Sequence, residues 1–351
     1  MSKSKLTLVV DGNWVLMSRL SVMQNRFADE HELMKDLKIL MTKSINVVLR
    51  TIPTIDNIIV VGDGGSWRNW IEVPSFLKKD DVEYKGNRVK SEDLNWDAIF
   101  QGYEEWFQLL KDNGIYVSRE RGVEGDDWCA YWSKKLNANG TNCIIWSKDK
   151  DLTQLVNQDE KTGIFTVCWN KDYVTLKESK KEEDDMNFLF SPSYNINEQL
   201  LESIINKTKD TNQINPMDVV IDKIIRGDLG DNVLPIVTKS SSNGTKTFRV
   251  GNKEIDFTLD INDNNAINEY ISNLLNKKSW KGKIGKPVNE IIEHFYYNKR
   301  LVYLDKSSYP EEIIEIMNKY DVPNECNKDL SDVESKLLAE KNSSIDVFEN
   351  I

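Results

Sequence analysis

Five short groups of acidic residues are the side chains in this sequence best suited to chemistry. They are Asp11, Asp63, Glu124 with Asp126 and Asp127, Asp149 with Asp151, and Asp228 with Asp231. A single aspartate usually caps a helix or fills a turn. Carboxylates that converge, however, stay ionised only when cations neutralise them. Mg²⁺ suits carboxylate and water ligands, and two such ions about 4 Å apart can activate a water and hold a scissile phosphate.

A basic segment, Tyr84-Lys85-Gly86-Asn87-Arg88, is a second candidate, with Arg68 upstream of it. On a helix, Lys85 and Arg88 would share one face and could grip a phosphate and screen its developing charge. Residues 68–93 hold six basic and six acidic side chains. Charge alone therefore favours a solvated helix face here.

Apolar, β-branched runs precede three of the acidic groups. Residues 6–10, 58–61 and 142–146 are expected to form buried strands that end at Asp11, Asp63 and Asp149 with Asp151. Helical patterns lie between the strands, at residues 30–49, 96–110 and 126–136. Aromatic residues of the second helix are expected in the core, because they follow the helical period. Strands that alternate with helices predict an α/β fold with a mostly parallel central sheet, whose carboxyl edge would gather the acids.

The second half of the chain is expected to be mostly helical. A charged run at 177–185 indicates a linker, and residues 239–247 indicate a polar loop. Helices are expected at residues 195–205, 216–225, 264–275, 287–297 and 310–320, followed by a frayed tail at 342–351.

Composition narrows the class of protein. The chain has 351 residues, 39% of them hydrophobic and 29% charged, which is typical of a globular protein. No apolar run approaches the roughly 20 residues of a membrane span, no signal peptide is evident, and a cytoplasmic location is expected. Four cysteines without paired spacing and two histidines disfavour zinc, so any metal should be a hard, oxygen-bound ion. The net charge of −11 argues mildly against a nucleic-acid partner unless the carboxylates bind cations.

Six short motifs occur in the order typical of one enzyme family. They are Asp-Gly-Asn at 11–13, Gly-Asp-Gly at 62–64, Tyr-Lys-Gly-Asn-Arg at 84–88, Glu-Gly-Asp-Asp at 124–127, Ser-Lys-Asp-Lys-Asp-Leu at 147–152 and Gly-Asp-Leu-Gly-Asp-Asn at 227–232. In this order they resemble the flap endonuclease or 5′–3′ exonuclease family. The resemblance covers residues 5–322, and the second half is most similar to the ribonuclease H branch of T-even-type bacteriophages.

The resemblance implies roles for these residues and an activity. Asp11, Asp63, Glu124, Asp126 and Asp127 would hold a first Mg²⁺, and Asp149, Asp151, Asp228 and Asp231 a second, with Mn²⁺ as a substitute. Lys85 and Arg88 would contact the attacked phosphate at the base of a helical arch, Arg68 would guide the 5′ strand, and Tyr84 would stack on a frayed base. The activity implied is 5′–3′ exonuclease, flap endonuclease and ribonuclease H cleavage that removes RNA primers and adjacent DNA during lagging-strand synthesis.

The resemblance also implies a domain organisation. Residues 1–185 would form the catalytic domain, with the arch at about 67–95, and residues 186–322 a helical domain that binds duplex. Residues 323–351 would form a tail, in which 344–348 resemble peptides that dock on a sliding clamp. The partners implied are DNA and RNA–DNA duplexes with a 5′ end or flap, a sliding clamp and a single-strand-binding protein, with the enzyme a monomer in the cytoplasm of a bacterial host.

One departure from the family pattern concerns duplex binding. Many members follow Gly-Asp-x-x-Asp-Asn with a glycine-rich turn that binds duplex backbone and a monovalent ion, whereas this chain continues with Val-Leu-Pro-Ile-Val at 233–237. A potassium site is therefore not expected. Five lysines within ten residues are the alternative contacts with duplex: Lys277, Lys278, Lys281, Lys283 and Lys286.

Three other classes of protein remain as alternatives. A haloacid-dehalogenase-type phosphatase needs a second aspartate two residues after the first, where this chain has Asn13. A PIN-like ribonuclease has fewer acids and lacks the later helical segment. A catalytically inactive binder of branched DNA would have no use for so many carboxylates.

Overall fold

The computed structural model describes residues 5–23, 30–78, 83–89, 91, 93–159, 161–169, 215–240, 247–281, 284, 286–323 and 327–348. The chain divides into two compact units, and each has a hydrophobic core of its own. Unit 1 comprises Met1–Gly65, Ser91–Gln213 and Glu315–Ile351, and unit 2 comprises Ser66–Lys90 and Ile214–Ile314. Within the described residues, no helix combines the length and apolar character that a membrane span needs.

Unit 1 is built on a six-stranded sheet in the order β3-β2-β1-β4-β6-β5. Its strands are β1 (Leu6–Asp11), β2 (Asn57–Val61), β3 (Tyr116–Ser118), β4 (Asn142–Trp146), β5 (Asn157–Gln158) and β6 (Phe165–Trp169). All pairs are parallel except β5 with β6. The mostly parallel sheet expected from the sequence is therefore confirmed, and the carboxyl ends of β1, β2 and β4 lie at one edge.

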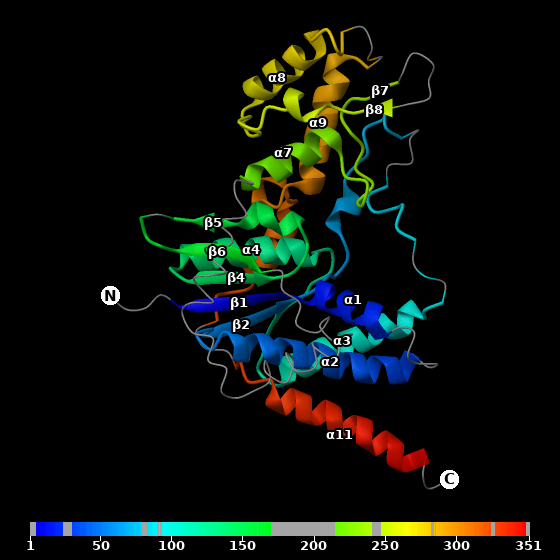
Figure 1. Cartoon of the computed structure of the whole chain (residues 1–351), viewed down its shortest axis with the longest axis vertical. Helices are drawn as coiled ribbons and strands as arrows, with labels where there is room; N and C mark the ends of the chain where they lie inside the picture. Colours follow the sequence, from blue (N-terminus) through cyan, green and yellow to red (C-terminus); the bar gives the residue numbers. More distant parts are fainter. Residues whose placement is uncertain are drawn as a thin grey trace, which may run out of the picture. The chain divides into compact units, whose positions relative to one another are not determined.

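Helices cover both faces of this sheet (Figure 1). They are α1 (Gly12–Met23), α2 (Glu30–Thr51), α3 (Trp96–Asp112) and α4 (Gly125–Ala138), with the 3₁₀ helix η2 (Asp151–Leu155). Helix α11 (Ser331–Phe348) packs against α2 rather than on the sheet. Leu8 and Val10 of β1 share a core cluster with α2 and α3, whereas α4 lies on the opposite face. Because side chains alternate along a strand, Asp11 points to the same face as Val9, which is the α4 face.

Aromatic residues of α3 pack in this core, as their helical spacing predicts. Tyr103, Trp106 and Phe107 are all at most 3% exposed. Phe100 is an exception at 38% exposed. Asn95 caps the start of the helix, because its side-chain oxygen accepts a hydrogen bond from the Ala98 N–H (3.2 Å).

Unit 2 is mainly helical, with a small hairpin. Its elements are the 3₁₀ helices η1 (Trp67–Trp70), η4 (Asn252–Glu254) and η5 (Lys306–Ser308), the strands β7 (Lys239–Ser240) and β8 (Thr247–Phe248), and the helices α7 (Pro216–Arg226), α8 (Asn264–Asn276) and α9 (Val288–Val302). Helix α10 (Glu311–Asn318) lies where the chain passes from unit 2 to unit 1. The expected helices at 216–225, 264–275, 287–297 and 310–320 are thus present, while the expected linker at 177–185 and helix at 195–205 lie outside the described residues.

The chain is partitioned differently from the expected domains. Residues 66–90, expected as an arch on the catalytic domain, belong to unit 2. Residues 315–351, expected in part as a tail, belong to unit 1, because Leu330, Val333 and Leu337 are buried in its core. Helix α11 continues to Phe348, so the frayed tail expected from residue 342 is not observed.

The expected helical arch also differs. Among the described residues of 67–95, η1 is the only helix, and residues 84–87 form a turn. Lys85 has a φ of 57°, which no α-helix contains. Lys85 and Arg88 therefore lie on a turn and do not share a helix face.

Candidate functional site

Two aspartates at neighbouring strand ends meet the N-terminus of α4. Asp11, the last residue of β1, is 4% exposed. Asp63 follows β2, and its Oδ1 accepts a hydrogen bond from the Gly125 N–H (2.5 Å). A Cβ built on Gly125 would stand 3.0 Å from that oxygen and 3.7 Å from Oδ1 of Asp11. The carboxylates of Asp11 and Asp63 therefore converge on the first turn of α4, as their positions in the sequence predict.

Asp149 brings a third carboxylate to this edge. The Ser147 hydroxyl donates to Oδ2 of Asp11 (2.7 Å) and accepts from the Asp149 N–H (3.0 Å). Oδ1 of Asp149 accepts from the Asp151 N–H (2.8 Å), which places Asp151 at the start of η2. One serine thus connects the ends of β1 and β4.

Burial and a neighbouring negative charge both act on the Asp11 carboxyl. Burial raises the pKa of its carboxyl, the Trp14 N–H and the Ser147 hydroxyl lower it, the negative charge of Asp149 raises it, and the net shift is upward. Ionisation of Asp11 therefore costs more free energy in the folded site than in water, and a bound cation would offset that extra cost. The donors are all carboxylate oxygens, so these residues fit a hard divalent ion.

Glu124, Asp126 and Asp127 form the beginning of α4. Asp127 is fully buried, and its Oδ2 accepts from the Glu124 N–H (3.3 Å), as in a capping box. Asp126 is partly exposed, and its charge, like that of Asp11, raises the pKa of the buried Cys129 thiol after the larger effect of desolvation. Within this triplet, Asp127 stabilises the helix start, whereas the charge of Asp126 acts on the same buried thiol as that of Asp11.

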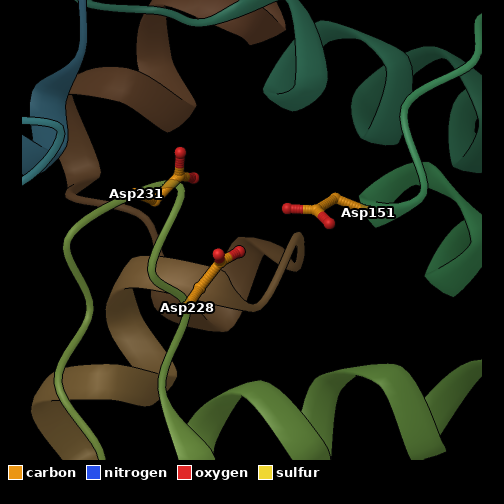
Figure 2. Close-up of side chains that lie close together, drawn as sticks. All are labelled: Asp151, Asp228 and Asp231. Atoms are coloured by element: carbon orange, nitrogen blue, oxygen red, sulfur yellow. The ribbon is translucent and has the colours of Figure 1, made fainter. Parts of the chain in front are cut away.

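The remaining two aspartates lie on a tight loop of unit 2. Helix α7 ends at Gly227, whose φ of 72° favours glycine, and a Cβ there would lie 2.2 Å from the Val233 carbonyl oxygen. Asp228 and Val233 close the loop with two backbone hydrogen bonds of 2.8 Å each. Figure 2 shows the Asp228 and Asp231 side chains projecting from this loop; Asp151, also labelled there, belongs to unit 1.

Cations of unit 2 pair with both loop aspartates. Lys223 on α7 forms an ion pair with Asp228, and Arg88 forms one with Asp231. Burial raises the pKa of the Asp228 carboxyl, but the hydrogen bond and charge of Lys223 outweigh it and leave the pKa below its usual value. Asp228 is therefore ionised and available to a metal ion at neutral pH.

Arg68 and Tyr84 are more enclosed than the sequence suggests. The Arg68 Nε donates to the Leu301 carbonyl (2.7 Å), and its guanidinium lies 4.7 Å from the Trp67 ring centre. The Tyr84 hydroxyl donates to Asp231 (3.2 Å), and its ring is only 8% exposed. Both line a pocket of about 360 Å³ within unit 2. These contacts give both side chains a packing role in unit 2.

The lysine-rich segment is mostly solvent-exposed. Lys277, Lys278 and Lys281 are exposed, Lys286 is partly covered with its Nζ 5.5 Å from the Phe76 ring centre, and Lys283 lies outside the described residues. Trp280 anchors the segment, because its Nε1 donates to Glu254 (2.8 Å). The exposed lysines are accessible to a polyanion.

A comparison with protein families identifies this arrangement. The model of the 5′–3′ exonuclease N-terminal, resolvase-like domain matches residues 7–186, which is more than half of the chain. The chain belongs to the 5′–3′ exonuclease family. Two curated relatives named 5′–3′ exonuclease come from Buchnera aphidicola. The protein of the subspecies from Acyrthosiphon pisum is 29% identical over 119 residues, and that from Schizaphis graminum is 27% identical over 160 residues.

The two sequence matches cover only part of each chain, whereas the match to a solved structure covers most of both chains. The sequence matches span 34% and 45% of this chain, and 38% and 51% of the relatives' own length. Among solved structures, the D15 protein of bacteriophage T5, co-crystallised with metal ions, has a TM-score of 0.50 at 17% identity, covering 90% of this chain and 96% of that one. This likeness shows the shared 5′–3′ exonuclease fold.

Two polar residues of the candidate site were not singled out by the sequence. Ser147 connects Asp11 with Asp149, and the Asn13 side-chain oxygen accepts from the Asp63 N–H (3.0 Å) and the Tyr103 hydroxyl (2.8 Å). Both belong to the quoted motifs. Both follow a predicted strand closely and stand near a carboxylate in the sequence, and this pattern could have identified them as site residues.

Proposed function

We propose that this chain is a divalent-metal-dependent 5′-nuclease that hydrolyses DNA and RNA phosphodiesters at 5′ ends and flaps. The observation that carries the proposal is the convergence of Asp11 and Asp63 on the α4 N-terminus, with Asp149 close enough to raise the pKa of Asp11. Membership of the 5′–3′ exonuclease family supports the same activity.

The proposed division of labour assigns each residue a task. Asp11, Asp63, Glu124 and Asp126 hold a first ion, with Asp127 fixing the helix start; Asp149, Asp151, Asp228 and Asp231 hold a second. When bound, such ions activate water and neutralise developing charge. Lys85 and Arg88 bind the attacked phosphate and stabilise the charge that grows on it.

The substrate class follows from this chemistry and from the resemblance to ribonuclease H of T-even-type bacteriophages. The proposed substrates are RNA primers and adjacent DNA at 5′ ends of lagging strands, the proposed ion is Mg²⁺ with Mn²⁺ as a substitute, and the proposed origin is a bacteriophage acting in its host's cytoplasm. The exposed lysines Lys277, Lys278 and Lys281 would contact duplex phosphates. A sliding clamp, through residues 344–348, and a single-strand-binding protein are proposed partners.

A cleavage assay tests the proposal directly. The wild-type chain should shorten a 5′-labelled flap and a labelled RNA–DNA hybrid as Mg²⁺ is titrated, and EDTA should stop it. Asp126→Asn and Asp149→Asn should abolish cleavage yet leave binding largely intact, and Lys85→Ala should slow cleavage by about 10²-fold or more. An inactive wild type that still binds branched DNA would support the binding-module alternative.

A further inference from the structure

Two asparagines of unit 2 join segments that are more than 140 residues apart in sequence. The Asn87 Nδ2 donates to the Leu229 carbonyl (2.7 Å). The Asn232 Nδ2 donates to the Glu83 carbonyl (2.9 Å). Each asparagine therefore reaches from its own segment to the backbone of the other, so the 83–88 turn and the 228–232 loop are joined at both ends.

Backbone and side-chain contacts fill the space between the two asparagines. The Lys85 N–H donates to the Asp231 carbonyl (2.9 Å), and the Arg88 Nε donates to the Gly230 carbonyl (3.2 Å). The Asp231 carboxylate accepts from Tyr84 and pairs with Arg88. The turn that carries the phosphate-binding cations is thus held against the loop that carries two metal-binding aspartates.

The backbone is unusual at this junction. Among the described residues, Lys85 (φ 57°) and Asn232 (φ 58°) are the only non-glycine residues with positive φ. Such conformations are uncommon outside glycine and persist where surrounding contacts fix them. Asparagine tolerates this region better than most residues, which suits position 232.

We infer that Asn87 and Asn232 are positioning residues that hold Lys85 and Arg88 in register with the loop of Asp231. This inference rests on the proposed function, in which the cations and the aspartates act on the same phosphate. Catalytic groups must be held within about 0.5 Å of their productive geometry, and side chains on turns need such external support. Without the two amides, the side-chain contacts of Tyr84 and Arg88 with the loop remain.

The test uses Asn87→Ala and Asn232→Gly, because glycine keeps the left-handed backbone while removing the amide. Single-turnover cleavage at saturating substrate should fall about 10-fold or more in each, since misplacement of about 1 Å costs up to about 10²-fold. Duplex binding in EDTA should change less than about 3-fold, because phosphate contacts by the exposed lysines remain. Hydrogen exchange in residues 83–89 should accelerate in both variants, which reports the loosened turn without any catalysis.

A double-mutant cycle separates positioning from a general structural role. In a Lys85→Ala background, adding Asn87→Ala should reduce cleavage by less than it does in the wild type, because one of the two cations that Asn87 positions is already missing. Asn268→Ala, at an exposed position of α8 in the same unit, is the matched control and should behave as the wild type.

Two results would overturn the inference. One is unchanged exchange in residues 83–89 in both asparagine variants. The other is an Asn87→Ala effect that persists in full in the Lys85→Ala background. Failure of the wild-type protein to cleave is a different result, because it would refute the proposed nuclease function itself.

Discussion

At Asp11, the buried charge that the proposed chemistry needs should lower the stability of the metal-free fold. Its carboxylate is buried, its pKa is raised, and Asp149 adds repulsion. Asp11→Asn removes the charge but keeps an oxygen that can accept from the Trp14 N–H. We expect this variant to unfold at a higher temperature than the wild type in EDTA, and to lose cleavage. Thermal unfolding with EDTA and with Mg²⁺ measures the effect, and Mg²⁺ should stabilise the variant less than the wild type.

Asp56 supplies the control for this prediction. Its side chain accepts from the Leu6 N–H (2.8 Å) in the same unit, and it lies at the start of β1 rather than at the end. Asp56→Asn should not raise the unfolding temperature in EDTA, and its response to Mg²⁺ should match the wild type. An Asp11→Asn variant no more stable than the wild type in EDTA would refute the crowding argument.

His294 on α9 predicts how the stability of unit 2 depends on pH. The side chain is 1% exposed, and burial, followed by the charge of Lys286, lowers its pKa from 6.5 to about 3. As pH falls, the unfolded chain therefore takes up a proton at His294 before the folded chain does. The stabilising contribution of the neutral His294 side chain is complete above about pH 6.5 and is lost as pH falls toward 3. Within this pH range, the loss of His294's contribution lowers the free energy of unfolding by about 1.4 kcal/mol per pH unit.

His294→Phe keeps a planar ring and removes the titration. Urea unfolding at neutral pH and at about pH 5 should show a smaller loss of stability in this variant than in the wild type. His31, the chain's other histidine, is exposed on α2, and His31→Phe should leave the wild-type slope unchanged. Equal slopes in all three proteins would show that His294 is not the group responsible.

Helix α11 is the element whose role differs most from the sequence-based expectation. Its Leu337 is 2% exposed in the core of unit 1, whereas the adjacent Leu338 is 37% exposed. Asn46 on α2 also donates to Glu334 (2.9 Å). Leu337→Ala should reduce the free energy of unfolding of unit 1 by about 2–5 kcal/mol, and Leu338→Ala by about 0.5 kcal/mol or less. Urea unfolding measures both, and a Leu337→Ala loss as small as that expected for Leu338→Ala would mean that α11 is a dispensable tail.

The elements that the sequence predicted well have strong local signals. Helix α7 was expected at 216–225 and extends from Pro216 to Arg226, because Asn215 caps it, Pro216 starts it and Gly227 ends it. Helix α1 was not anticipated, since its one buried face includes Gly12 and Arg19 while Met17 is 47% exposed, and so the helix lacks a clear apolar stripe. Local pattern thus identifies helices whose buried face is apolar and misses those whose buried face contains polar or small residues.

The candidate site also shows which features local sequence patterns can predict and which depend on contacts between distant residues. The strand ends placed Asp11 and Asp63 correctly because parallel strands share one carboxyl edge. The 83–88 segment was expected as a helix, but its conformation depends on the 228–232 loop, as the Lys85 N–H bond to the Asp231 carbonyl shows. No local pattern reports a contact between residues so far apart in sequence.

At the scale of the whole molecule, metal binding should contribute to folding stability, because the chain has a net charge of −11 and its proposed metal-binding carboxylates are divided between two units. Asp11, Asp63, Glu124 and Asp126 lie in unit 1, and Asp228 and Asp231 lie in unit 2. A ligand that binds only the folded state stabilises it by about 2.7 kcal/mol at 100 times its dissociation constant. An ion held by Asp228 and Asp231 should therefore stabilise unit 2, and an ion held by Asp11 and Asp63 should stabilise unit 1.

Calorimetry with Mg²⁺ can separate these contributions. In the wild type, Mg²⁺ should raise the unfolding temperatures of both units. In Asp228→Asn, it should still raise that of unit 1 but leave that of unit 2 nearly unchanged. Asp222→Asn breaks a comparable ion pair, with Arg226 on the same helix, and should respond to Mg²⁺ as the wild type does. If Mg²⁺ stabilises unit 2 equally in Asp228→Asn, the aspartate loop does not hold the second ion, and the 83–88 turn has no metal site to be positioned against.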